Sequence, residues 1–147
     1  MLRDEGLDLL TEPECYDLLA SGSIGRVGVT VGALPVILPV NYRTVERDVV
    51  FRTSPGTKLR AALDHAVIAF EVDALDAERR SGWSVLVVGR AREVVDPDEV
   101  ARLDALDLAP WAGDAGRDRW VRLHPEFVSG RRIPHALASD GDEPTIA

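Results

Sequence analysis

Apolar and polar residues alternate with the period of β-strands along most of the chain, and short helical segments interrupt them. The first helical segment begins at Thr11, which together with Glu14 has the form of a capping box, and it ends at Ser21-Gly22. After this helix the period changes to that of strands. We expect strands over residues 23–31, 34–42, 49–53, 66–72, 82–95 and 126–133, and two further short helices over 57–63 and 96–106.

The second expected strand carries two prolines, Pro35 and Pro39. A proline has no N–H group to donate to a neighbouring strand. The strand over residues 34–42 should therefore lie at a sheet edge, or bulge where these prolines sit.

Short turns, rather than long helical crossovers, join most of the expected strands. This arrangement favours an antiparallel sheet that closes as a small barrel over a doubly wound parallel sheet. Residues 1–147 contain no internal repeat and no linker, and their length is typical of a single domain. Residues 138–147 have no periodicity, and we expect them to form a mobile tail.

Composition places the chain among ordinary globular domains. It has 147 residues, a hydrophobic fraction of 46% and a formal charge of −8, which argues against nucleic acid as the main partner. Cys15 is the sole cysteine, so an internal disulfide framework is excluded. No segment approaches the ~20 apolar residues of a membrane span, and the first residues do not have the pattern of a signal peptide, so we expect a cytoplasmic protein without a membrane partner.

Residues 51–60 hold the clearest candidate chemistry. A strand ends there, a Ser-Pro-Gly turn follows and a helix begins, with hydroxyls on Thr53, Ser54 and Thr57 and with the only lysine, Lys58. Free N–H groups and the positive end of the helix dipole favour a phosphate at such a helix start. The alternative interpretation is a capped helix with solvated basic residues.

Other candidate sites are weaker. Trp83 and Ser84 begin a strand and are suited to flanking a planar ligand, although a core tryptophan at a barrel mouth fits equally well. The three histidines lack metal-ligand spacing, and no nucleophile-elbow motif is present. The acidic residues from Asp96 to Asp107 are interpreted as a solvated helix face.

Several segments, taken in order, resemble one family. The resemblance covers roughly residues 10–134 and rests on Val27-Gly28-Val29, residues 35–42, Val50-Phe51-Arg52-Thr53, Gly56-Thr57-Lys58, residues 70–73, residues 82–85 and Gly89-Arg90-Ala91. The chain resembles the pyridoxamine 5'-phosphate oxidase-like, FMN-binding split-barrel proteins. The resemblance implies a mainly β fold, a six-stranded antiparallel Greek-key split barrel with short flanking helices. It also implies a homodimer with two flavin sites at the subunit interface.

The resemblance also implies roles for five residues on the strand 34–42 and around the 51–60 segment. Val40 and Asn41 would lie along the isoalloxazine ring. Thr53 and Ser54 would contact the phosphate, and Lys58 would be its cation.

Further contacts implied by the resemblance come from later in the chain. Trp83 and Ser84 would approach the flavin from an adjacent strand of the same subunit or of the other one. Arg119, Trp120 and Arg131 are candidates for a contact from the second subunit.

The function expected on this basis is an FMN-dependent oxidoreductase of the pyridoxamine 5'-phosphate oxidase-like type, which transfers hydride between FMN and a small organic substrate. A deazaflavin-dependent reductase is an alternative, and the longer anionic tail of that cofactor would need more basic contacts. A non-catalytic flavin-binding or storage protein and a structural dimer with an empty groove are further alternatives. No residue stands out as a catalytic acid or base.

Overall fold

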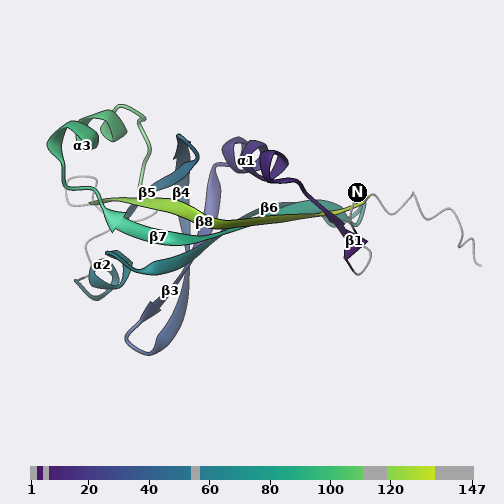
Figure 1. Cartoon of the computed structure of the whole chain (residues 1–147), viewed down its shortest axis with the longest axis horizontal. Coiled ribbons are helices and arrows are strands. Elements are labelled where there is room, and N and C mark those ends of the chain that lie inside the picture. Colours follow the sequence, from purple (N-terminus) through teal and green to yellow (C-terminus); the bar gives the residue numbers. More distant parts are fainter. Residues whose placement is uncertain (1–2, 5–6, 54–56, 111–118, 135–147) are drawn as a thin grey trace, which may run out of the picture.

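A closed β-barrel forms the centre of this computed structural model, which describes residues 3–4, 7–53, 57–110 and 119–134 (Figure 1). The strands are β1 (Arg3–Asp4), β2 (Leu7–Leu9), β3 (Ile24–Val31), β4 (Leu34–Val45), β5 (Asp48–Thr53), β6 (Val67–Asp76), β7 (Ser81–Glu93) and β8 (Arg119–Ile133). The helices are α1 (Glu12–Ser21), α2 (Thr57–Leu63) and α3 (Pro97–Asp104). The expected mobile tail, 138–147, lies outside the described residues.

Six antiparallel strands close the barrel in the order β8-β5-β4-β3-β6-β7, and β7 pairs with β8 to complete the ring. The β1–β2 hairpin adds to β8 through Asp8 and Leu9. Figure 1 shows β6, β7 and β8 continuing together beyond the barrel to the end where β1 lies. The predicted mainly β, six-stranded antiparallel split barrel with short flanking helices is therefore confirmed.

Helix starts follow the local sequence signals. Thr11 accepts a hydrogen bond from the Glu14 backbone N–H, and the Glu14 side chain accepts one from the Thr11 backbone N–H, so the predicted capping box is present at α1. Asp96 caps α3 by accepting from the Glu99 backbone N–H at 3.2 Å, and Pro97 occupies the first turn. The helix α2 has the predicted bounds.

The two prolines of β4 lie where only one neighbouring strand pairs with them. Pro35 is opposite Thr30 and Pro39 opposite Arg26, both on β3, whereas β5 pairs with β4 only from Tyr42 onward. The first part of β4 is therefore an edge, as predicted, because a proline can lie in a strand whose missing N–H faces no partner.

The core fills the barrel interior. Its largest fully buried side chains include Tyr42, Phe51 and Phe70, and the rings of Tyr42 and Phe70 meet edge to face with centroids 4.7 Å apart. The Tyr42 hydroxyl donates to the Leu19 carbonyl at 2.5 Å and so ties α1 to the barrel. A second cluster, Val50, Val94, Leu103, Leu108 and Trp120, lies between α3 and the outside of the barrel.

Three strands are clearly longer than the sequence pattern indicated, and β4, which continues to Val45 by pairing with β5, is the first. The strand β6 continues to Asp76 because its charged end pairs with the start of β7. The strand β8 begins at Arg119 instead of at Glu126, since residues 119–123 pair with β5 while residues 121–133 pair with β7. The hairpin of β1 and β2 was not predicted, because strands of two and three residues carry too little periodicity.

Candidate functional site

The end of β5 and the start of α2 carry the predicted phosphate-binding residues. Thr53 is the last residue of β5, opposite Arg119 of β8, and Lys58 is the second residue of α2. Ser54 lies between them, outside the described residues. The strand-to-helix transition predicted for a phosphate site is thus present in the backbone.

Glu93 changes the charge expected at this end of the barrel. Its carboxylate lies 2.9 Å from Arg60 Nε and 3.3 Å from Arg119 Nε, and its side chain is largely buried. Two of the cations near the β5–α2 transition are therefore held by one carboxylate from β7. Lys58 is the other basic residue of α2, and its side chain lies outside the part of the structure that is described.

Val40 and Asn41 are adjacent in β4, and their side chains lie on opposite faces of the sheet. Val40 packs in the barrel core, so a ligand outside the barrel would reach only its main chain. Asn41 is on the outer face, and its Nδ2 donates to the Ala109 carbonyl at 3.2 Å. Arg52 of β5 donates to the neighbouring Leu108 carbonyl at 3.0 Å, so the segment after α3 is tied to both strands.

Trp83 and Ser84 likewise face opposite sides of β7. Ser84 is paired with Asp73 and Arg131, on the same outer face as Asn41. Trp83 lies on the other face and lines a pocket of about 440 Å³ at the end of the β6–β7 hairpin, together with Leu75, Arg132 and Ile133 among others.

The predicted residues therefore form two groups within one chain. Thr53 lies beside Arg119 at the start of β8, whereas Ser84 lies beside Arg131 near its end. Arg119 and Arg131 are 12 residues apart along β8, which is roughly 40 Å of strand at about 3.3 Å per residue. One chain does not bring both groups within reach of one mononucleotide.

An apolar row crosses the outside of five strands. The strand register aligns Ile37, Gly28, Ala69, Val88 and Phe127 on β4, β3, β6, β7 and β8. Ile37 is 73% exposed and Phe127 56% exposed, while a Cβ atom built on Gly28 would have no neighbour closer than 3.5 Å. The middle of the row is therefore flat, apolar and open, which is typical of a surface that meets a planar group or another protein.

Charged residues lie beside this row. Arg26 Nη1 is 3.2 Å from both Glu71 Oε1 and Asp73 Oδ2. Burial, and then the hydrogen bond and charge of Asp73, raise the pKa of Glu71 to about 7, although Arg26 acts in the opposite direction.

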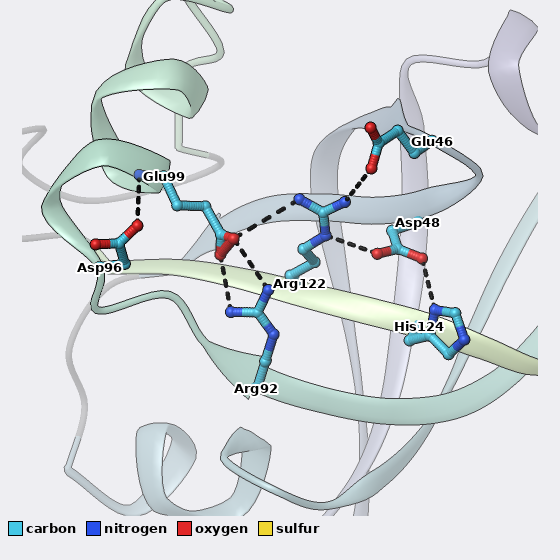
Figure 2. Close-up of polar contacts among 7 residues, drawn as sticks. All are labelled: Glu46, Asp48, Arg92, Asp96, Glu99, Arg122 and His124. Atoms are coloured by element: carbon cyan, nitrogen blue, oxygen red, sulfur yellow. Dashed lines mark hydrogen bonds and ion pairs between the residues drawn. The ribbon is translucent and has the colours of Figure 1, made fainter.

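A separate polar network lies under α3 (Figure 2). Arg122 of β8 donates from Nε to Asp48 Oδ2 at 2.6 Å, and His124 Nδ1 is 2.9 Å from Asp48 Oδ1. Arg92 contacts both oxygens of Glu99, at 2.8 Å and 3.0 Å. The hydrogen bond from Arg92 lowers the pKa of Glu99, and Glu99 in turn raises the pKa of Arg92.

This network corrects one interpretation of the sequence. Glu99 is not part of a solvated helix face, since its side chain is 14% exposed and lies between Arg92 and Arg122. Asp104 also has a specific partner, because it accepts a hydrogen bond from Trp120 Nε1 at 2.7 Å. Arg92 on β7 precedes Glu99 by 7 residues, and Trp120 on β8 follows Asp104 by 16 residues. Neither spacing is that of neighbours on one helix face, so the helical pattern does not indicate these pairs.

The described part of the chain contains neither a metal-ligand cluster nor a helix long and apolar enough to span a membrane. Among these residues, no group of three or more His, Cys, Asp or Glu side chains is placed to hold a metal ion. None of the helices α1 to α3 has the length and apolar composition of a membrane span.

The chain matches a family profile, a related sequence and two solved structures over most of its length. The sequence profile of the pyridoxamine 5'-phosphate oxidase family matches residues 11–132. An uncharacterised Mycobacterium tuberculosis protein, Rv0080, is 45% identical over 129 residues, which is 84% of each chain. The solved structure of an FAD-binding protein from Mycobacterium smegmatis is 39% identical with a TM-score of 0.73, and the match covers 86% of this chain and all of that one. A candidate pyridoxamine 5'-phosphate oxidase from Corynebacterium glutamicum is 33% identical with a TM-score of 0.75, covering 88% of this chain and 95% of that one.

Proposed function

The chain belongs to the pyridoxamine 5'-phosphate oxidase family, and a solved relative from M. smegmatis is described as FAD-binding, so we propose that this protein is a flavin-dependent oxidoreductase that acts as a homodimer. The observation that carries this proposal is the open apolar row on the outer sheet face. Asn41 and Ser84 lie on the same face, each four residues along its strand from a member of the row. When bound, the flavin supplies hydride transfer to or from a small organic substrate.

A second copy of the chain explains why the site residues form two groups. Thr53 and Lys58 lie roughly 40 Å along β8 from the group that contains Ser84, so one flavin contacts both only if they come from different subunits. An antiparallel pairing of two copies over the apolar row brings each β5–α2 transition towards the other subunit's β7. The flat centre at Gly28 and Ala69 fits a planar heterocycle.

In this arrangement, the predicted residues divide between the phosphate end and the ring of the flavin. Thr53, Ser54 and Lys58 hold the phosphate end by hydrogen bonds and charge. Asn41 and the main chain of Val40 lie along the ring. Ser84 approaches the ring from the other subunit, with Arg131 as a further contact. Arg119 lies beside Thr53 at the phosphate end, and Trp83 lines the pocket on the opposite face of β7. Trp120 is buried in the cluster under α3, so it is not available to a ligand.

The flavin is FMN or FAD, and each has an observation in its favour. The phosphate-binding segment 51–60 is suited to the single phosphate of FMN. The M. smegmatis relative, at 39% identity, is described as FAD-binding, which favours FAD. Chromatography of the flavin released from the purified protein identifies it, and titration with FMN, FAD and a deazaflavin gives the order of affinity. If the deazaflavin binds most tightly, the cofactor assignment is wrong.

A substitution on the apolar row tests the dimer and the flavin together. We expect Phe127→Glu to convert the dimer to a monomer in sedimentation analysis and to lose the flavin absorbance, because a charge cannot be buried unpaired in the interface. Val95→Glu is the matched control, since Val95 is 76% exposed but lies between β7 and α3, off the row. A Phe127→Glu protein that stays dimeric and yellow would refute the proposed interface.

Lys58→Ala tests the phosphate end. Loss of a charge-assisted hydrogen bond costs about 1.5–3 kcal/mol, so the dissociation constant for flavin should rise roughly tenfold or more. Arg79→Ala is the control, because Arg79 is an exposed cation in the β6–β7 turn. Equal affinities in the two variants would remove Lys58 from the site.

Turnover separates an enzyme from a storage protein. If the protein is an oxidoreductase, we expect a nicotinamide or another small donor to reduce the bound flavin and an organic acceptor to reoxidise it. A protein that binds flavin tightly but remains inert with every donor and acceptor supports the storage alternative.

A further inference from the structure

The pocket beneath α3 has the size and walls of a small-molecule site that is separate from the flavin surface. Its volume is about 540 Å³, within the range of roughly 300–1,000 Å³ typical of ligand pockets. The β4–β5 turn, β7, α3 and β8 supply its lining. One wall is aliphatic and consists of Val45, Leu103 and Leu106.

Two carboxylates in this pocket are paired with its arginines. Asp48 uses one oxygen for Arg122 and the other for His124 (Figure 2). Glu99 Oε2 accepts a hydrogen bond from Arg92, while the buried Oε1 has only an ion-pair contact with Arg92 at 2.8 Å. The side chains of Asp48 and Glu99 are 13% and 14% exposed, so neither is free to turn towards a ligand. Both carboxylates therefore hold the guanidinium groups in place.

The guanidinium groups keep unused donors. Each guanidinium has five N–H donors, and Arg122 uses its Nε on Asp48, while its terminal nitrogens have only long contacts, 3.9 Å to Glu99 and 3.5 Å to Glu46. Arg102 also lines the pocket, and it forms no ion pair with any residue in the described ranges, although its charge acts on Glu99.

Glu46 is the weak partner of this set. Its side chain is 87% exposed and lies in the turn between β4 and β5, where its φ angle is +52°. An exposed ion pair in water is weak, so a competing anion can displace Glu46 from Arg122.

We propose that this pocket binds a small organic carboxylate with an apolar body. The carboxylate accepts hydrogen bonds from Arg102 and from the terminal nitrogens of Arg122, in place of Glu46. The apolar body packs against the aliphatic wall. The site is independent of the flavin proposal, because none of its lining residues belongs to either predicted flavin group.

Titration of the ¹⁵N-labelled full chain, with whatever flavin it carries, tests this site. The probes are acetate, hexanoate, phenylacetate and 4-phenylbutyrate, together with the uncharged amide analogues hexanamide and 4-phenylbutyramide. We expect saturable shifts of the side-chain Nε–H signals of Arg102 and Arg122. The best acid should bind at least tenfold more tightly than its amide, which lacks the charge that the guanidinium groups recognise.

Three variants give the direction of each contribution. Arg102→Gln should weaken binding of the best acid at least tenfold, whereas Glu46→Gln should tighten it several-fold, because a competing carboxylate is removed. Arg79→Gln, on the β6–β7 turn, is the control and should leave the affinity unchanged. Thermal melts verify that the variants are folded, which the exposure of Arg102 and Glu46 favours.

The outcomes separate the proposal from its rivals. Equal binding of acid and amide would show an apolar pocket without anion recognition and would overturn the proposal. The proposal is also overturned if Arg102→Gln binds the best acid as tightly as Arg79→Gln does, or if every acid has a dissociation constant above about 10 mM. A tighter affinity in Glu46→Gln is the most specific support, since a purely structural network has no reason to gain a ligand when one of its members is neutralised.

Discussion

Replacing Arg122 with methionine removes the central cation of the network under α3 while keeping a side chain of similar length. The Arg122 side chain is 13% exposed, and its Nε lies 2.6 Å from Asp48 Oδ2. Without it, Asp48 has only His124 and Glu99 has only Arg92 as a partner. Removal of one member of a buried ion pair costs about 3–5 kcal/mol, because the remaining charges stay buried.

Because both carboxylates keep one partner, we expect the free energy of unfolding to fall by about 3 kcal/mol, the lower end of this range. At about 2–4 °C per kcal/mol for a domain of this size, the melting temperature should fall by roughly 6–12 °C. Equilibrium unfolding in urea at fixed protein concentration, followed by tryptophan fluorescence, measures the loss. Glu46→Gln is the control and should change stability by less than about 0.5 kcal/mol, because Glu46 is exposed. A loss below about 1 kcal/mol in Arg122→Met would refute the assignment of this network as a buried and stabilising one.

Three further substitutions test other parts of the barrel. Tyr42→Phe removes the donor to the buried Leu19 carbonyl and should cost about 1–3 kcal/mol in urea unfolding; a change within experimental error would contradict that bond. The pKa of Glu71 is raised from 4.5 to about 7 in the folded chain, so the free energy of unfolding should decrease as the pH rises from 4.5 to 7. Glu71→Gln should flatten this decrease and be more stable than the wild type at pH 8. Parallel stability curves for the two proteins would contradict the raised pKa. A Cβ atom on Gly89 would clash with the His124 carbonyl oxygen at the bulge between β7 and β8, so Gly89→Ala should lower stability by about 1–3 kcal/mol. An unchanged melting temperature would contradict this close approach.

Local signals explain how much of the fold is predictable. The capping box of Thr11 and Glu14 and the cap of Asp96 lie within four residues of the helix starts that they fix, so the sequence alone places α1 and α3. The two prolines of β4 likewise indicate an edge without reference to a partner strand. The alternation of buried and exposed residues gives most of the strands of the barrel.

Long-range pairing explains what was not predicted. The start of β8 at Arg119 depends on β5, which lies about 70 residues earlier, and nothing in residues 119–123 alone indicates that pairing. Glu93 is recognisable as the partner of Arg60 and Arg119 only once β7, α2 and β8 are assembled. The pocket under α3 likewise draws its lining from four elements, so its chemistry has no motif in the sequence.

The last strand of the barrel also determines when the chain can fold during synthesis. Because β8 bonds to β5 on one side and to β7 on the other, the ring stays open until residues 119–133 have left the ribosome. Until then β5 and β7 each present a free edge and the interior is open to water, so the nascent chain is exposed to aggregation. We therefore expect chaperone dependence to persist until the ribosome has added the C-terminal strand and to end soon after it emerges.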